Sequence, residues 1–218
     1  MKIIRKKDLT TSQWSGGTTT QLYIYPKQAT YQKLNFDFRL SSARVEIEES
    51  TFTKLKGISR IIMVLEGETF LTHKQRDTVY LKKFNIDHFE GDWDTSSKGK
   101  VVDFNLMLNQ NYEGNLSHLI LTKNRSQPVQ QTNKNGSLII YLYQGLVYVI
   151  AGEKEITMGA GDTLVLNSTK DKGNININAP EASVLIISEI SKKKDKWNIT
   201  LYLTALFGDQ HAHKDNPL

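Results

Sequence analysis

Two stretches of the chain follow one pattern, and this repeat limits the fold more than any other feature. Residues 61–73 read IIMVLEGETFLTH, and residues 139–151 read IIYLYQGLVYVIA. In each, a short apolar run reaches one glycine, Gly67 or Gly145, and a second run of β-forming residues follows. Such a pattern predicts two strands joined by a tight turn.

A glycine–aspartate pair follows each stretch and extends the repeat. The pairs stand at residues 91–92 and 161–162. Glycine accepts positive φ, and an aspartate side chain can bond the backbone two residues on, so such a pair fixes a turn. The matched order predicts an internal duplication in which Asp92 superposes on Asp162, as Gly67 does on Gly145.

Short segments rich in β-branched and aromatic residues fill most of the remaining chain. We predict strands at residues 20–25, 36–40, 43–47, 60–66, 69–72, 101–108, 138–143, 146–151, 163–166, 175–177 and 184–188. This spacing predicts a mainly all-β sandwich or barrel. The late segment KDKWNITLYLTALFGD has apolar residues four apart and predicts a short C-terminal helix, with an edge strand as the alternative.

Composition argues against several classes of function. The chain has 218 residues, 39% of them hydrophobic, which suffices for one large β-domain or two small packed ones. The net charge of +5 comes from scattered residues, so we predict no nucleic-acid partner. The absence of cysteine removes disulfides and thiol chemistry. No export signal or long apolar span stands out, so we expect a cytoplasmic protein without a membrane partner.

Six pieces of the first half, taken in order, resemble the motifs of the HutD/Ves family. They are WSGGT from Trp14, FRLSSA from Phe38, Phe52 with KLKGISR after it, VLEG to Gly67, FEGD to Asp92, and VDFNLML at 102–108. The order of strands and turns also resembles the cupin superfamily, whose jelly-roll barrels cover their sheet edges.

The resemblance implies a bacterial, cytoplasmic bicupin made of two duplicated cupin-like jelly-roll barrels. We place the barrels at residues 1–115 and 116–218, packed tightly enough to count as one bicupin domain. The family's biochemical activity is not established. Its namesake lies with genes of histidine utilisation, which implies a small-molecule or regulatory role in amino-acid utilisation or stress response.

The histidines do not form the metal site found in many cupins, in which an HxH pair and a carboxylate converge from facing strands. They are His73, His88, His118, His211 and His213, and the HxH pair lies in the tail QHAHKD. We therefore predict no metal and no other cofactor. Nucleophile-elbow, Walker and dinucleotide motifs are also missing from the sequence, which favours a protein that is not an enzyme.

Polar residues on a predicted strand of the first barrel begin the candidate site. Strict alternation places Phe36, Phe38 and Leu40 on one face and Arg39 with Ser41 on the other. A barrel interior that contains Arg39 needs an anion.

A second arginine and two polar residues extend this site. Arg60 opens the apolar run IIMVL, where a permanent charge needs a carboxylate of the protein or of a ligand. Asp103 and Asn105 project together from a strand whose other face is apolar. Asp103 is either the buried ion-pair partner of an arginine or a ligand contact, and the sequence favours neither.

The stretch QWSGGTTTQ at residues 13–21 has two interpretations. It is either a polar turn whose indole fills a core edge, or a ligand wall in which glycines admit backbone N–H groups. We predict the wall, with Trp14 folded over the barrel mouth and Gly17 and Thr18 beside it. Phe52 and Phe89 are expected in core or rim packing.

These residues predict a pocket for a small anionic metabolite that bears a carboxylate. The predicted ligand-binding set is Trp14, Gly17, Thr18, Arg39, Ser41, Arg60, Asp103 and Asn105. The histidine-utilisation context implied by the resemblance suggests urocanate or formylglutamate. One alternative is a metal-independent isomerase or hydrolase that uses Asp103 with an arginine, and another is a structural or protein-binding bicupin. A homodimer is compatible with each.

Overall fold

The computed structural model describes residues 1–130, 136–167 and 174–194 of the chain. Within these ranges the regular elements are strands and one short 3-10 turn, η1 (Lys6–Asp8), so the prediction of a mainly all-β fold is confirmed. No helix in the same ranges is long and apolar enough to span a membrane. The predicted C-terminal helix and its edge-strand alternative lie outside the described residues.

The strands are short, as the spacing of turn residues predicts. They are β1 (Lys2–Ile4), β2 (Thr10–Trp14), β3 (Gly17–Tyr25), β4 (Phe38–Val45), β5 (Glu49–Thr51), β6 (Ile58–Gly67), β7 (Thr69–His73), β8 (Thr78–Leu81), β9 (Ile86–Glu90), β10 (Thr95–Lys98), β11 (Val101–Asn109), β12 (Tyr112–Leu121), β13 (Arg125–Val129), β14 (Gly136–Gln144), β15 (Leu146–Ala151), β16 (Lys154–Gly159), β17 (Thr163–Asn167), β18 (Ile175–Ala179) and β19 (Ser183–Lys192).

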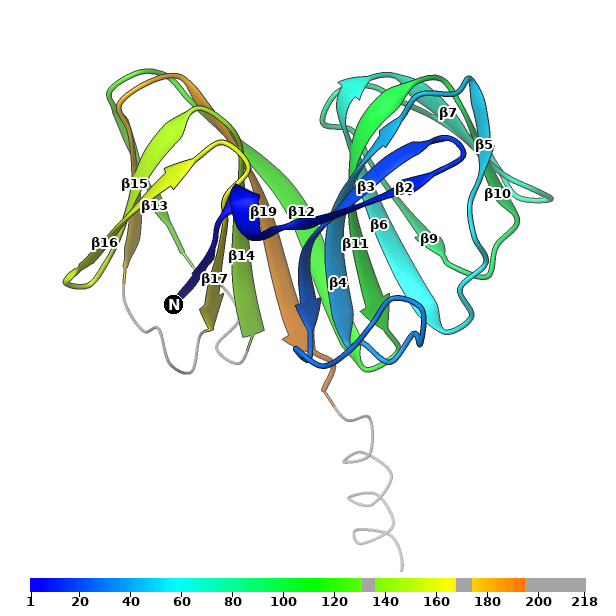
Figure 1. The fold of residues 1–218 in the computed structure, drawn as a ribbon, viewed down its shortest axis with the longest axis horizontal. Helices are drawn as coiled ribbons and strands as arrows, with labels where there is room; N and C mark the ends of the chain where they lie inside the picture. The colour runs from blue at the N-terminus through cyan, green and yellow to red at the C-terminus, as the bar shows by residue number, and fades with distance from the viewer. Residues whose placement is uncertain (131–135, 168–173, 195–218) are drawn as a thin grey trace, which may run out of the picture.

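The strands form two sandwiches that lie side by side (Figure 1). In the first sandwich, a six-stranded sheet of order β2-β3-β4-β11-β6-β9 accompanies a four-stranded sheet of order β5-β10-β7-β8. In the second, a five-stranded sheet of order β1-β17-β14-β19-β12 accompanies a four-stranded sheet of order β13-β18-β15-β16. The short turn between β11 and β12 connects the two.

The strand orders of the two sandwiches match and confirm the duplication. The order β4-β11-β6-β9 corresponds to β12-β19-β14-β17, and β5-β10-β7-β8 corresponds to β13-β18-β15-β16. Gly67 and Gly145 occupy the same turn of this repeat, and both have positive φ, 76° and 95°. The predicted pairing of these glycines is therefore correct.

The predicted pairing of Asp92 with Asp162 is wrong. Asp162 lies between β16 and β17, whose counterparts are β8 and β9, whereas Asp92 lies between β9 and β10. At the β8–β9 turn the backbone N–H of Phe84 donates to β6, as that of Gly161 donates to β14, both at 2.7 Å. The side chains of Asn85 and Asp162 each accept from the backbone N–H three residues earlier, at 2.9 and 3.1 Å. Phe84 and Asn85 of the first sandwich thus correspond to Gly161 and Asp162 of the second.

The large sheets of the two sandwiches pack against each other through apolar faces. Phe38, Leu40 and Phe104 share one buried cluster with Ile139 and Ile186 of the second sandwich. Since successive side chains on a strand point to opposite faces, this packing directs the intervening polar residues into the first sandwich.

The strands predicted at residues 36–40 and 43–47 are one continuous strand, β4. Phe36 precedes this strand and packs with Leu55, Ile58 and Met107 in a separate cluster. Its predicted place on one face with Phe38 and Leu40 is therefore wrong, because strand alternation applies only within the strand.

The interiors of the two sandwiches differ. That of the second is filled by an apolar cluster that includes Leu138, Ile140, Leu164 and Ile177, each without measurable exposure. The interior of the first combines a smaller apolar cluster with buried polar and charged side chains, and this contrast places the candidate site there.

The N-terminal segment connects both sandwiches. Strand β1 pairs with β17 of the second, and β2 pairs with β3 of the first (Figure 1). Between them, Asp162 accepts hydrogen bonds from Arg5 Nη1 at 2.8 Å and from the Lys6 backbone N–H at 2.9 Å. Burial alone would raise the pKa of Asp162, but these bonds and one from the Gly159 N–H lower it below its ordinary value.

We expect Asp162→Ala to lower the free energy of unfolding by about 1.5–3 kcal/mol, as for other hydrogen bonds to a charged group. The variant removes the acceptor that holds both the N-terminal segment and the β16–β17 turn. Chemical denaturation measures the change, with the exposed Asp8→Ala as the control. Equal stability of the two variants would show that this contact is dispensable.

Candidate anion-binding cavity

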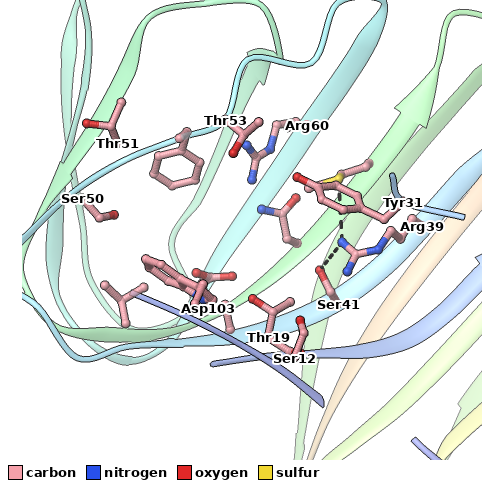
Figure 2. A pocket seen from close by; sticks show the side chains of 16 residues that line it. Ser12, Thr19, Tyr31, Arg39, Ser41, Ser50, Thr51, Thr53, Arg60 and Asp103 are labelled. Atoms are coloured by element: carbon pink, nitrogen blue, oxygen red, sulfur yellow. Dashed lines mark hydrogen bonds between the residues drawn. The ribbon is translucent and has the colours of Figure 1, made fainter. Parts of the chain in front are cut away.

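A cavity of about 310 Å³ lies inside the first sandwich (Figure 2). Its floor is formed by β4, β11 and β6, which carry matched rows of side chains. Met107 of β11 lies directly opposite Arg39 of β4 and Arg60 of β6. The next inward positions on β11 are Asn105 and Asp103. Since neighbouring strands lie about 4.8 Å apart, the two arginine backbones are separated by roughly 10 Å.

Most of the predicted site residues line this cavity. They are Trp14, Arg39, Ser41, Arg60, Asp103 and Asn105. Gly17 and Thr18 are not among its lining residues. Thr19 lines it in place of Thr18, because side chains alternate along β3, and Ser12 of β2 lies opposite Thr19 in the register.

Other lining residues lie outside the predicted set. They are Tyr31, Ser50, Thr51, Phe52, Thr53 and Met107, together with Ser12, Thr19, Ala43 and Val45. Several lie in or near loops and the short strand β5, where no alternation of apolar and polar residues marks them. Met107 could have been found by continuing the alternation of Asp103 and Asn105 by one step.

The two glycines after Trp14 fulfil different requirements. A Cβ atom on Gly16 would lie 2.1 Å from the Trp14 ring and 2.7 Å from Ile47 Cδ1, so the indole folds directly over Gly16. Gly17 has φ +147°, and a Cβ there would lie 1.9 Å from the Arg44 carbonyl oxygen. Gly16 therefore allows the position of the indole at the cavity wall, and Gly17 allows β3 to approach β4.

Arg39 is buried but retains several neutral contacts. Its Nε donates to Gln21 Oε1 and its Nη1 to Ser41 Oγ, both at 3.0 Å. Its guanidinium also lies 4.6 Å from the centre of the Tyr31 ring. Burial lowers the pKa of Arg39, and the nearby Tyr31 partly opposes this effect. Among the described residues no carboxylate lies within 4.0 Å of its nitrogens.

Arg60 is the most isolated charge of the cavity. Only 6% of it is exposed, and its guanidinium lies 4.7 Å and 5.1 Å from the ring centres of Phe52 and Phe89. Its buried Nε has no hydrogen-bond partner in the described part of the chain. Burial lowers the pKa of Arg60 to about 10, although Asp103 opposes the shift, so the side chain stays charged at neutral pH. Both phenylalanines thus contact the candidate site, beyond the packing role expected for them.

Asp103 and Asn105 supply acceptors deep in the cavity. They are 5% and 4% exposed, and neither Oδ1 atom has a hydrogen-bond partner among the described residues. Burial raises the pKa of Asp103 to about 7, while Arg60 and a hydrogen bond from the Ala43 backbone act in the opposite direction. Within the described ranges no ion pair of 4.0 Å or less joins Asp103 to either arginine, so the ion pair, one of the two alternatives left open for Asp103, is not formed there.

His73 lies outside this cavity in a site of its own. Its Nδ1 shares a hydrogen bond with Thr95 Oγ1 and its Nε2 with Asp87 Oδ2, both at 2.9 Å. Its ring also packs against Phe89 and Trp93. Across the three described ranges, no group of three or more histidine and acidic side chains is arranged to hold a metal ion. His211 and His213 lie outside those ranges.

The duplicated sandwiches define a cupin-like bicupin whose first sandwich contains a cavity lined by two arginines, an aspartate and an asparagine. The HutD family model matches residues 6–186, and the chain belongs to the HutD family. The match covers both sandwiches. No protein with a curated description matches the chain.

Solved structures share this fold. A conserved protein of unknown function from Pseudomonas aeruginosa has a TM-score of 0.74 and 22% identity, with 88% of this chain and 98% of that chain covered. HutD from Pseudomonas fluorescens, in a formate condition, has a TM-score of 0.65 and 22% identity, with 88% and 99% covered. The bacterial pirin YhhW from Escherichia coli, in complex with nickel(II), has a TM-score of 0.65 and 11% identity, with 86% and 97% covered.

Proposed function

We propose that the protein binds a small carboxylate metabolite in the cavity of the first sandwich and acts as a cytoplasmic regulatory protein. The observation that carries the proposal is Arg60, a buried cation whose Nε lacks a partner in the described part of the chain. A buried charge without an ionic partner costs several kcal/mol. A ligand carboxylate beside Arg60 would offset that cost through charge-assisted hydrogen bonds.

The chemistry of the cavity narrows the ligand class. Arg39 and Arg60 offer donors, whereas the Oδ1 atoms of Asp103 and Asn105 need them. A fitting ligand therefore combines a carboxylate with an N–H or O–H group. Urocanate has an imidazole N–H and formylglutamate an amide N–H, so both belong to this class. The solved HutD in a formate condition supports the choice of a carboxylate only as an analogy between family members.

We also propose a division of labour along the chain. Residues 1–115 would form the ligand-binding unit, and residues 116–218 would form a supporting unit whose described interior is packed with apolar side chains. A cavity of about 310 Å³ that the side chains of the first unit leave open favours ligand binding over a purely structural bicupin, whose pocket side chains would fill.

Arg60→Met tests the proposal because it keeps the apolar stem and removes the guanidinium. We expect the variant to bind urocanate or formylglutamate about 10- to 100-fold more weakly at pH 6, the loss expected for a charge-assisted hydrogen bond. Isothermal titration calorimetry measures the change, and Arg125→Met in the second sandwich is the matched control. If Arg60→Met bound these ligands as tightly as the wild type does, the cavity would be excluded as their binding site. If several small carboxylates failed to bind the wild type, carboxylates would be excluded as the ligand class.

Asp103 supports one second candidate function. A buried carboxyl group with a pKa of about 7 faces the cavity and is suited to general acid–base catalysis, as in a metal-independent isomerase or hydrolase. Nuclear magnetic resonance of a bound ligand over hours distinguishes the two functions. A ligand that stays unchanged supports binding alone. Formation of a product by the wild type, but not by Asp103→Asn, supports catalysis.

A further inference from the structure

A second cavity, of about 700 Å³, adjoins the first. We call it the hydroxyl groove after six lining residues that bear hydroxyl groups: Ser50, Thr51, Thr53, Thr72, Ser96 and Ser97. The two cavities share Trp14, Ser50, Thr51 and Thr53 as lining residues. They are therefore neighbouring parts of one depression, with the indole of Trp14 belonging to the walls of both.

The groove continues from the end of the cavity that lies away from Arg39. Figure 2 shows Arg39 and Ser41 at one end of the first cavity and Ser50 and Thr51 at the other. Since Ser50 and Thr51 also line the groove, a ligand held by its carboxylate can extend past Trp14 into it. The first cavity alone has roughly ten times the volume of one water molecule in the liquid, about 30 Å³, so an anion as small as formate would leave most of it unused.

The side chains of the groove are suited to an uncharged polar group. Thr51, Ser96 and Thr72 lie directly opposite one another on the exposed face of three neighbouring strands about 5 Å apart, and the Thr72 hydroxyl group also shares a hydrogen bond of 3.1 Å with that of Thr78. Ser50 and Ser97 lie on the opposite face of the same strands and share one hydrogen bond of 3.0 Å, so one of their two hydroxyl hydrogens stays available.

The charges of the groove cancel at one end. Glu49 and Lys98 line it and form an exposed ion pair of 3.6 Å. The groove therefore contributes no net charge that would favour a second ionic group. Trp14, which is 37% exposed, adds an apolar face against which the C–H groups of an extended chain can pack.

We propose that the hydroxyl groove is a second subsite, which binds the uncharged, hydroxyl-bearing part of the same ligand. The inference rests on the proposed carboxylate binding at Arg60. It names the ligand class as an elongated polyhydroxylated or similarly polar carboxylate, with the anion in the first cavity and the polar extension beside Trp14.

Three probes with one carboxylate each test this proposal by calorimetry on the full chain at pH 6. They are gluconate, hexanoate of equal length without hydroxyl groups, and propionate, which is too short to reach the groove. We expect gluconate to bind at least tenfold more tightly than either of the others. Equal affinity of gluconate and hexanoate would overturn the second subsite while leaving carboxylate binding intact. Absence of binding by all three would instead contradict the proposed function.

Variants of the groove give an independent readout. The double change Thr72→Val with Ser96→Ala should weaken gluconate binding by about tenfold and leave propionate binding unchanged, since both residues line the groove and neither lines the first cavity. Ser126→Ala on the second sandwich is the control, because it removes an exposed hydroxyl group far from both cavities. An equal loss for gluconate and propionate would show a general effect on the cavity and overturn the assignment of the groove.

Discussion

Raising the pH from 4 to 8 should lower the free energy of unfolding by about 4 kcal/mol through Asp103 alone. The burial of this carboxyl group raises its folded-state pKa from 3.8 to about 7. Between these two values the folded protein holds a proton that the unfolded chain has released. The stabilising contribution is therefore complete below pH 4 and is lost as the pH rises through 7.

Asp103→Asn should remove most of this pH dependence. The amide has nearly the shape of the protonated carboxyl group and does not ionise, so the variant should match the wild type at pH 4 and exceed its stability at pH 8. Urea denaturation at closely spaced pH values measures both effects. The control is Asp92→Asn, which removes an exposed carboxylate and should keep the wild-type profile. Parallel profiles for the wild type and Asp103→Asn would show that Asp103 is ionised throughout.

Gly17→Ala should destabilise the fold by about 3–5 kcal/mol, because it combines a strained backbone with a steric overlap. Gly17 has φ +147°, and the new Cβ would lie 1.9 Å from a backbone carbonyl oxygen of β4, which cannot turn aside. Thermal or chemical denaturation measures the loss. Stability within 1 kcal/mol of the wild type would show that the hairpin of β2 and β3 tolerates a wider separation from β4.

Gly16→Ala is the matched comparison and should behave differently. Its Cβ would collide with the far end of the Trp14 ring, a side chain that can move, so we expect a stability loss of only about 1 kcal/mol with displacement of the indole. Subtracting the fluorescence spectrum of the double variant Gly16→Ala with Trp14→Phe from that of Gly16→Ala gives the emission of Trp14, which reports displacement of the indole. An unmoved indole together with a large stability loss would contradict this assignment.

Strand alternation allowed much of the fold and of the cavity floor to be predicted. In β4 and β11, Arg39 and Asp103 each stand between two apolar residues, so burial of Phe38, Leu40 and Phe104 fixes the direction of these two side chains. Strands without this contrast were missed. TTSQW of β2 is exposed along its whole length, and TSSK of β10 is a polar run, so neither carries a hydrophobic signal.

The rest of the candidate site depends on distances that no local pattern contains. The choice of Thr19 over Thr18 follows from the pairing register of β2 with β3, which flips with a shift of one residue. Tyr31 and Thr53 reach the cavity from segments outside the strands. Whether Asp103 forms an ion pair with an arginine also could not be predicted locally, because the residue types allow such a pair and only the side-chain positions decide it.

The N-terminal segment makes the two sandwiches inseparable by simple truncation. Its first strand completes the sheet edge at β17, and its next strand carries Ser12 and Trp14 to the cavity wall. A fragment limited to the first sandwich would leave β1 without its neighbour and expose the apolar face that now meets the second. The first sandwich therefore owes its shape to a second one whose described interior is filled by apolar side chains, and a duplicated copy with such an interior can still be retained by selection as the support of its twin.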